Sequence, residues 1–118
     1  MGRLTTHVLD VTSGKPARGV HITLYARADD DSLARLAEAV TNAEGRCDAP
    51  LLEGNTFAKG RYRLVFAVGD YFVVQGVAVA KPPFLDEVAV DFGVADPAGH
   101  YHIPLLVSPW SYATYRGS

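Results

Sequence analysis

An alternation of apolar and polar residues at every second position is the feature that most restricts the fold of this chain. The apolar positions of three segments follow this pattern: Val20, Ile22 and Leu24; Tyr62, Leu64, Phe66 and Val68; and Val88, Val90, Phe92 and Val94. Successive side chains of a β-strand point to opposite faces, so a period of two indicates strands with a buried face. Each of the three segments is therefore predicted to be a β-strand.

Turn-forming residues separate these segments. They are Ser13-Gly14-Lys15-Pro16, Ala43-Glu44-Gly45, Lys59-Gly60, Pro82-Pro83 and Asp96-Pro97-Ala98-Gly99. Many short strands divided by such turns are typical of an all-β sandwich. A length of 118 residues suits one domain, and no repeat or linker divides the sequence. Residues 1–118 are therefore predicted to form a single domain.

Two segments also fit a helix. Residues 32–40 have high helix propensity, with Leu33, Leu36, Ala37 and Val40 at helical spacing. Leu36 and Val40 would equally share one face of a strand, so both structures remain open, although propensity favours the helix. Residues 69–75 are predicted to form one short helix after a strand.

Charge and cysteine content narrow the possible partners and the compartment. The net charge is −2 with both signs interspersed, so we expect neither a nucleic-acid nor a membrane partner. Cys47 is the single cysteine, which excludes an intramolecular disulfide and fits a reducing compartment. The first residues lack the apolar stretch of a signal peptide. We therefore expect a cytoplasmic protein.

Among the polar residues, the histidines are the strongest candidates for a functional site. His100 and His102 lie two positions apart, so on a strand both side chains point to the same face. Such a pair can bind a metal, transfer protons or simply be polar surface, and the spacing leaves all three open. His7 lies far upstream, so only the fold can bring it near His102. Cys47 is a weaker candidate nucleophile, because a free cysteine usually packs as a small apolar residue.

The end of the chain is rich in aromatic residues. Residues 112–118 read Tyr-Ala-Thr-Tyr-Arg-Gly-Ser, an aromatic-rich and strand-like segment that runs to the last residue. Chain ends usually fray unless they are held by the rest of the domain. The composition indicates a docked terminus, and a frayed strand end is the alternative.

Four segments, taken in order, resemble the 5-hydroxyisourate hydrolases of the transthyretin-like family. They are residues 4–10 (Leu-Thr-Thr-His-Val-Leu-Asp), 41–47 (Thr-Asn-Ala-Glu-Gly-Arg-Cys), 100–109 (His-Tyr-His-Ile-Pro-Leu-Leu-Val-Ser-Pro) and 115–118 (Tyr-Arg-Gly-Ser). The resemblance implies a transthyretin-like β-sandwich of two four-stranded sheets, with one short helix that begins near Asp70. It also implies a strand from Leu33 to Thr41 and a homotetramer whose active sites lie where dimers meet.

The same resemblance implies a set of site residues. The catalytic residues would be His7, Arg46 and His102, and the substrate pocket would be shaped by Ser118, Tyr115 and Arg116. His100 would have a supporting place. We expect no cofactor and no metal, because a guanidinium is permanently charged and offers a cation no lone pair.

These residue types suit the chemistry that the resemblance implies, which is hydrolysis of a ring amide of 5-hydroxyisourate, a purine-derived small molecule. Histidine titrates near pH 6.5 and can take and return protons, while arginine can stabilise an oxyanion. Which histidine is the base stays open. The alternative is a transthyretin-type carrier on the same fold, but such carriers lack the two histidines and the arginine at these positions.

Overall fold

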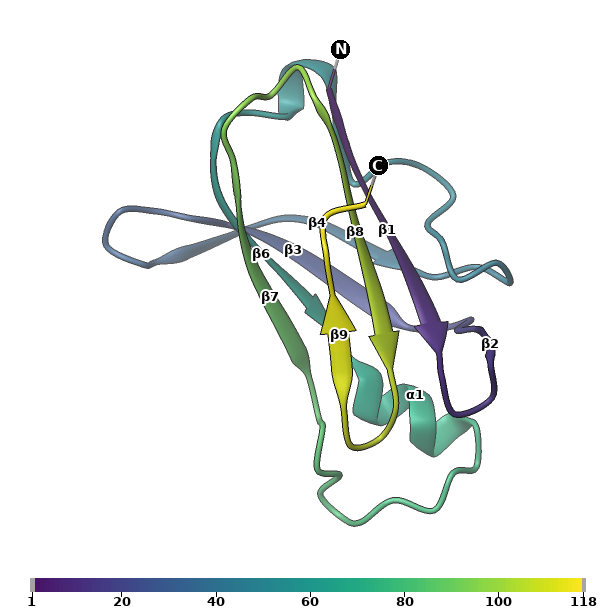
Figure 1. Cartoon of the computed structure of the whole chain (residues 1–118). Coiled ribbons are helices and arrows are strands. Elements are labelled where there is room, and N and C mark those ends of the chain that lie inside the picture. The colour runs from purple at the N-terminus through teal and green to yellow at the C-terminus, as the bar shows by residue number, and fades with distance from the viewer. Residues whose placement is uncertain (1, 118) are drawn as a thin grey trace.

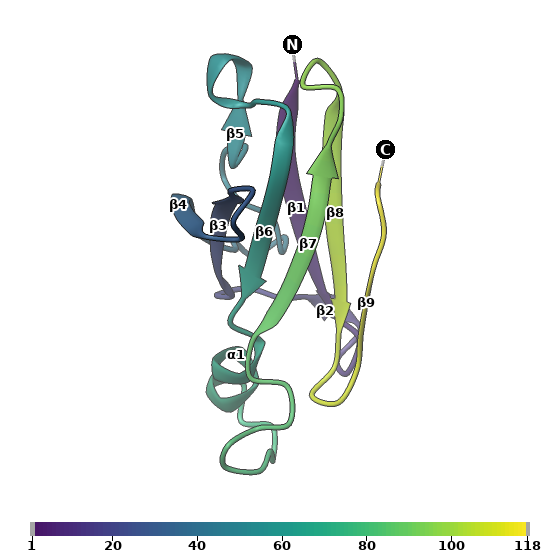
Figure 2. The ribbon, with the colours of Figure 1, turned by 90° about the vertical axis from the view of Figure 1, so that its left-hand side faces the viewer.

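The chain folds into two β-sheets packed face to face, with one α-helix at one end (Figures 1 and 2). The computed structural model describes residues 2–117. The first sheet has the order β2-β1-β8-β9, with β5 pairing on β1; its strands are β1 (Arg3–Asp10), β2 (Lys15–Pro16), β5 (Leu52–Glu53), β8 (His100–Val107) and β9 (Tyr112–Thr114). The second sheet has the order β4-β3-β6-β7; its strands are β3 (His21–Arg27), β4 (Leu33–Val40), β6 (Gly60–Phe66) and β7 (Val88–Val94). The helices are α1 (Val68–Val74) and the short 3₁₀ turn η1 (Gly54–Thr56).

The predicted all-β sandwich with one short α-helix is confirmed, with two differences in detail. The first sheet has five strands instead of four, because the two-residue strand β5 pairs with the start of β1 through Leu4 and Leu52. The helix α1 begins at Val68, two residues before Asp70, because the buried Val68 side chain continues the packing of β6 into the helix.

Residues 33–40 form the strand β4 despite their helix propensity. β4 is an edge strand that pairs only with β3 among the described residues. Ala37 and Ala39 pack against the core, while Leu36 and Val40 are exposed on the other face. Tertiary pairing therefore overrides local propensity in this segment.

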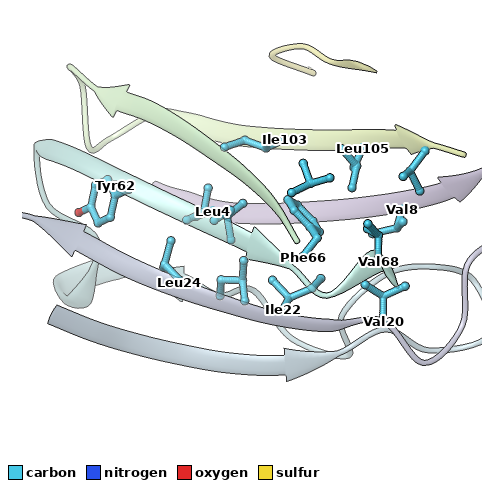
Figure 3. Packing of buried hydrophobic residues seen from close by; sticks show 14 of the residues in the cluster. Leu4, Val8, Val20, Ile22, Leu24, Tyr62, Phe66, Val68, Ile103 and Leu105 are labelled. Atoms are coloured by element: carbon cyan, nitrogen blue, oxygen red, sulfur yellow. The ribbon is translucent and has the colours of Figure 1, made fainter. Parts of the chain in front are cut away.

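The core lies between the two sheets and is filled by alternate residues of the facing strands (Figure 3). Leu4 and Val8 of β1 and Leu105 of β8 are fully buried against Leu24 and Phe66 from the second sheet. Because side chains alternate across a strand, the intervening residues of β1 and β8 face away from this core.

The central pair of the first sheet is parallel and joins the two ends of the chain. β1 and β8 pair in the register Arg3↔His100, Thr5↔His102 and His7↔Pro104. Strands that lie about ninety residues apart in sequence thus run side by side (Figure 1). No helix within residues 2–117 has the length and apolar character to cross a membrane.

Candidate active site

Two histidines from the two central strands come together on the outer face of the first sheet. His7 of β1 and His102 of β8 are half-buried, and their ring centroids lie 6.2 Å apart with an interplanar angle of 28°. Each follows a buried residue by one position, so the alternation that builds the core also directs both imidazoles outward. The structure thus brings together residues that the sequence separates widely.

Arg46 reaches this face through a tight turn. The Asn42 side-chain oxygen accepts hydrogen bonds from the backbone N–H groups of Glu44 (2.9 Å) and Arg46 (3.2 Å). Gly45 adopts a φ of 75°, and a side chain there would overlap the Val8 carbonyl oxygen. The turn ends in an antiparallel bridge between Arg46 and His7, which sets the arginine beside the imidazole pair.

Thr5 links the two histidines of β8. Its hydroxyl lies 2.8 Å from Nδ1 of His102 and 2.9 Å from Nε2 of His100. His100 is exposed, whereas His102 is half-buried. The three side chains share one face because Thr5 stands opposite His102 in the parallel register.

Electrostatics keep both central imidazoles neutral. Burial, and after it the nearby Arg46 guanidinium, lowers the pKa of His7 below its ordinary value of 6.5. Burial also lowers the pKa of His102, and Arg46, His7 and His100 lower it further. A neutral imidazole is the form that accepts a proton, so both rings can act as bases at neutral pH.

A polar cavity opens beside these residues. Its volume is about 350 Å³, and its lining includes Arg3, Thr5, Arg46, Asp48, His100 and His102. Cys47 also lines it, but burial and, to a smaller extent, Asp48 raise the pKa of the Cys47 thiol. A thiol that stays protonated is a poor nucleophile, which argues against catalysis by Cys47.

The C-terminal segment is docked on β8 as far as Gly117, which confirms the expected held terminus. The backbone N–H of Gly117 donates to the His102 carbonyl over 2.7 Å. Ser118, the predicted substrate-binding residue next to it, lies outside the described residues. The end of the described chain therefore runs directly beside His102.

Tyr115 and Arg116 lie elsewhere within the chain. Both line a second cavity on the other side of β8, together with Phe92 and Tyr101, and not the cavity that contains Arg46 and His102. The Arg116 guanidinium carbon stacks 4.0 Å from the centroid of the Tyr101 ring. Within the single chain, these two residues therefore do not reach the histidine pair.

Two features of the site were missed in the sequence. The Thr5 hydroxyl contacts two histidines, and Gly117 is packed so closely that a β-carbon there would lie 2.8 Å from Cδ2 of His102. The contact of Thr5 with the histidines could have been predicted from the β1–β8 register, because that register places Thr5 opposite His102. No local sequence signal indicates the close packing of Gly117 against His102.

Comparison with known proteins agrees with this architecture. The model of the HIUase/Transthyretin family matches residues 4–117. The 5-hydroxyisourate hydrolase of Pseudomonas aeruginosa is 52% identical over 118 residues, covering 100% of this chain and 93% of that protein. The structure of Klebsiella pneumoniae 5-hydroxyisourate hydrolase superposes with a TM-score of 0.82 at 34% identity and covers 100% of both chains. Sea bream transthyretin in complex with thyroxine superposes with a TM-score of 0.86 at 32% identity, covering 98% of this chain and 94% of that one.

The fold and the site together define a transthyretin-type β-sandwich that carries an imidazole pair and a guanidinium on the outer face of one sheet. The fold alone does not distinguish a 5-hydroxyisourate hydrolase from a transthyretin, since both superpose well. With 114 matched positions from residue 4 to residue 117, the chain belongs to the HIUase/Transthyretin family.

Proposed function

We propose that this protein is a 5-hydroxyisourate hydrolase. It opens a ring amide of 5-hydroxyisourate with water and yields 2-oxo-4-hydroxy-4-carboxy-5-ureidoimidazoline, a step of urate degradation. Family membership and 52% identity over the full chain to a protein of that activity support the proposal. The single observation that carries it is the convergence of His7, Arg46 and His102 from three distant segments.

The proposed mechanism assigns each of these residues a part. One of the two neutral imidazoles takes a proton from water as its oxygen bonds to the amide carbonyl carbon. The Arg46 guanidinium stabilises the oxyanion that forms, because it is permanently charged and presents several donors. The carbon–nitrogen bond then breaks, and the protonated imidazole returns its proton to the departing nitrogen. The second imidazole orients the water.

The C-terminal residues complete the proposed pocket. The backbone N–H of Gly117 donates to the His102 carbonyl, and Ser118 is the next residue in the sequence. We assign its hydroxyl to substrate binding. We also assign Tyr115 and Arg116 a part in shaping the pocket, on the family resemblance alone, because within one chain both line the second cavity.

A direct test follows the loss of 5-hydroxyisourate absorbance and subtracts the spontaneous decay. The wild-type protein is expected to accelerate the decay, and His102→Asn is expected to abolish that acceleration. Asparagine keeps a polar side chain of similar reach but cannot exchange protons near neutral pH. Full turnover by H102N would remove His102 from the mechanism, and no acceleration by the wild type would refute the function itself.

A carrier is the second candidate, because sea bream transthyretin in complex with thyroxine shares the fold. Ligands that bind the folded state raise its melting temperature. The hydrolase proposal predicts stabilisation by urate-like purines and none by thyroxine. The reverse pattern would favour the carrier.

Assembly and location are also part of the proposal. A homotetramer with active sites between dimers would bury His7 and His102 further, and both are only half-buried in the single chain. Sedimentation at micromolar concentration tests the assembly. A cytoplasmic location rests on the single cysteine and is tested by cell fractionation.

A further inference from the structure

The Thr5 hydroxyl stands between two imidazoles, and its geometry restricts how protons are placed there. The hydroxyl oxygen lies 2.8 Å from Nδ1 of His102 and 2.9 Å from Nε2 of His100, both within hydrogen-bond distance. A hydroxyl carries one proton and two acceptor sites, so it donates to at most one of the rings. The other ring must then donate its own N–H to the hydroxyl oxygen.

We propose that Thr5 is a positioning residue that relays protons between His102 and His100. This inference rests on the proposed function, because the relay operates only if His102 transfers protons during hydrolysis. In the resting arrangement Nδ1–H of His102 donates to the Thr5 oxygen, and the Thr5 hydroxyl donates to Nε2 of His100. Nε2 of His102 is then left with a free lone pair towards the reacting water.

The relay balances in protons and charge. When Nε2 of His102 takes a proton from water, the ring becomes an imidazolium. Its Nδ1 proton passes to the Thr5 oxygen while the Thr5 proton passes to Nε2 of His100. His102 becomes neutral again with its proton on Nε2, and His100 carries the positive charge. The reverse shift restores Nδ1–H of His102 as Nε2–H is given to the departing nitrogen.

The surroundings give this transfer a direction. His102 faces the Arg46 guanidinium and His7 from neighbouring segments and His100 from its own strand, and it is half-buried. Arg3 and Asp48 line the same cavity. A positive charge is poorly tolerated in such a place, whereas His100 is exposed and its charge would be solvated. The relay therefore moves charge from the crowded centre to solvent.

The experiment compares Thr5→Val, Thr5→Ser, His100→Gln and the double variant T5V/H100Q. Valine keeps the branched shape of threonine and has a methyl group in place of the hydroxyl, whereas serine keeps the hydroxyl. T5V is expected to lower kcat about 10- to 100-fold with KM nearly unchanged, which is the scale of one assisted proton transfer. T5S is expected to recover most of that loss. The double variant is expected to be no slower than T5V, because both changes interrupt the same path.

Thr23→Val is the matched control. Thr23 is a half-buried threonine of β3, so T23V removes a hydroxyl at a comparable strand position in the sheet that does not carry His100 and His102. It is expected to keep wild-type kcat. Melting temperatures of all variants separate loss of folding from loss of the relay.

A spectroscopic measurement tests the same inference without turnover. Nitrogen-15 NMR of labelled histidines is expected to show His102 protonated on Nδ1 in the wild type and a mixture of tautomers in T5V. Wild-type kcat in T5V, an additive loss in T5V/H100Q, or an unchanged His102 tautomer would each overturn the relay. If these occur while H102N is inactive, the hydrolase proposal stands and the relay alone fails. If H102N turns over normally, the relay fails together with the role of His102, while the hydrolase function stands. If the wild type does not accelerate the decay, the hydrolase function itself fails.

Discussion

Replacement of Gly117 by alanine is expected to disable catalysis while the sandwich stays folded. An added β-carbon would lie 2.8 Å from Cδ2 of His102 and 3.4 Å from its Cβ and Cγ. Carbon atoms pack at about 3.5–4.0 Å, so the ring or the terminal strand must move by roughly 0.7 Å or more. Displacement of a catalytic group by about 1 Å costs on the order of 10²-fold in rate. We expect kcat of G117A to fall by about 10- to 100-fold.

The assay measures kcat from 5-hydroxyisourate loss, together with the melting temperature. Gly117 lies at the end of the chain, away from the core, so the free energy of unfolding is expected to change by only about 0.5 kcal/mol. Gly93→Ala is the matched control, because a β-carbon at this β7 position meets no atom within 4 Å. Wild-type kcat in G117A would refute the argument that this glycine provides clearance for the His102 ring. An equal loss in G93A would show that the effect is not specific to that contact.

Three further predictions follow from the site and its support. Activity should fall on the acid side of the pH profile of kcat/KM with a midpoint below pH 6.5. Burial and Arg46 lower the pKa of His102, and the ring loses its proton-accepting form only below that pKa. A midpoint at or above pH 6.5, after correction for titration of the substrate, would contradict this. Arg46→Gln should lower kcat about 10²- to 10³-fold, as loss of an oxyanion donor does. It should also move the acid limb of the profile to higher pH. A pH profile that does not move would show that Arg46 does not lower the pKa of the histidine pair. Tyr71→Phe should lower the free energy of unfolding by about 1–3 kcal/mol and leave kcat unchanged, because it removes the 2.8 Å hydrogen bond to the buried Asp10 carboxylate. Urea denaturation measures the loss, and an unchanged urea midpoint would contradict the prediction.

The strands with one buried face could be predicted from the sequence, because burial itself produces the period of two. Ile22, Leu24, Leu64 and Phe66 are all buried where the alternation places them. Residues 33–40 could not be assigned from propensity, because what selects the strand is pairing with β3, a non-local interaction. Only the family resemblance led to the correct structure for that segment.

For His7, Arg46 and His102, the sequence could indicate the residues of the candidate site but not their arrangement. His7 and His102 are recognisable as candidates from family motifs, but their closeness depends on the parallel register of β1 and β8. Register is set by which faces are buried across a complete sheet, so it is not encoded in either segment alone. The position of Tyr115 and Arg116 on a second cavity follows in the same way from the course of the chain after β9.

The backbone segments that carry the site differ in how many backbone hydrogen bonds hold them. His7 and His102 stand on the two central strands of the first sheet, within the parallel ladder of eight residue pairs that joins β1 to β8. Arg46 and Gly117 each join those strands through one isolated bridge. Segments with few backbone hydrogen bonds open at lower free energy than central strands. The imidazole pair is therefore preorganised by the fold itself, while the guanidinium and the chain end can adjust around a substrate without disturbing the core.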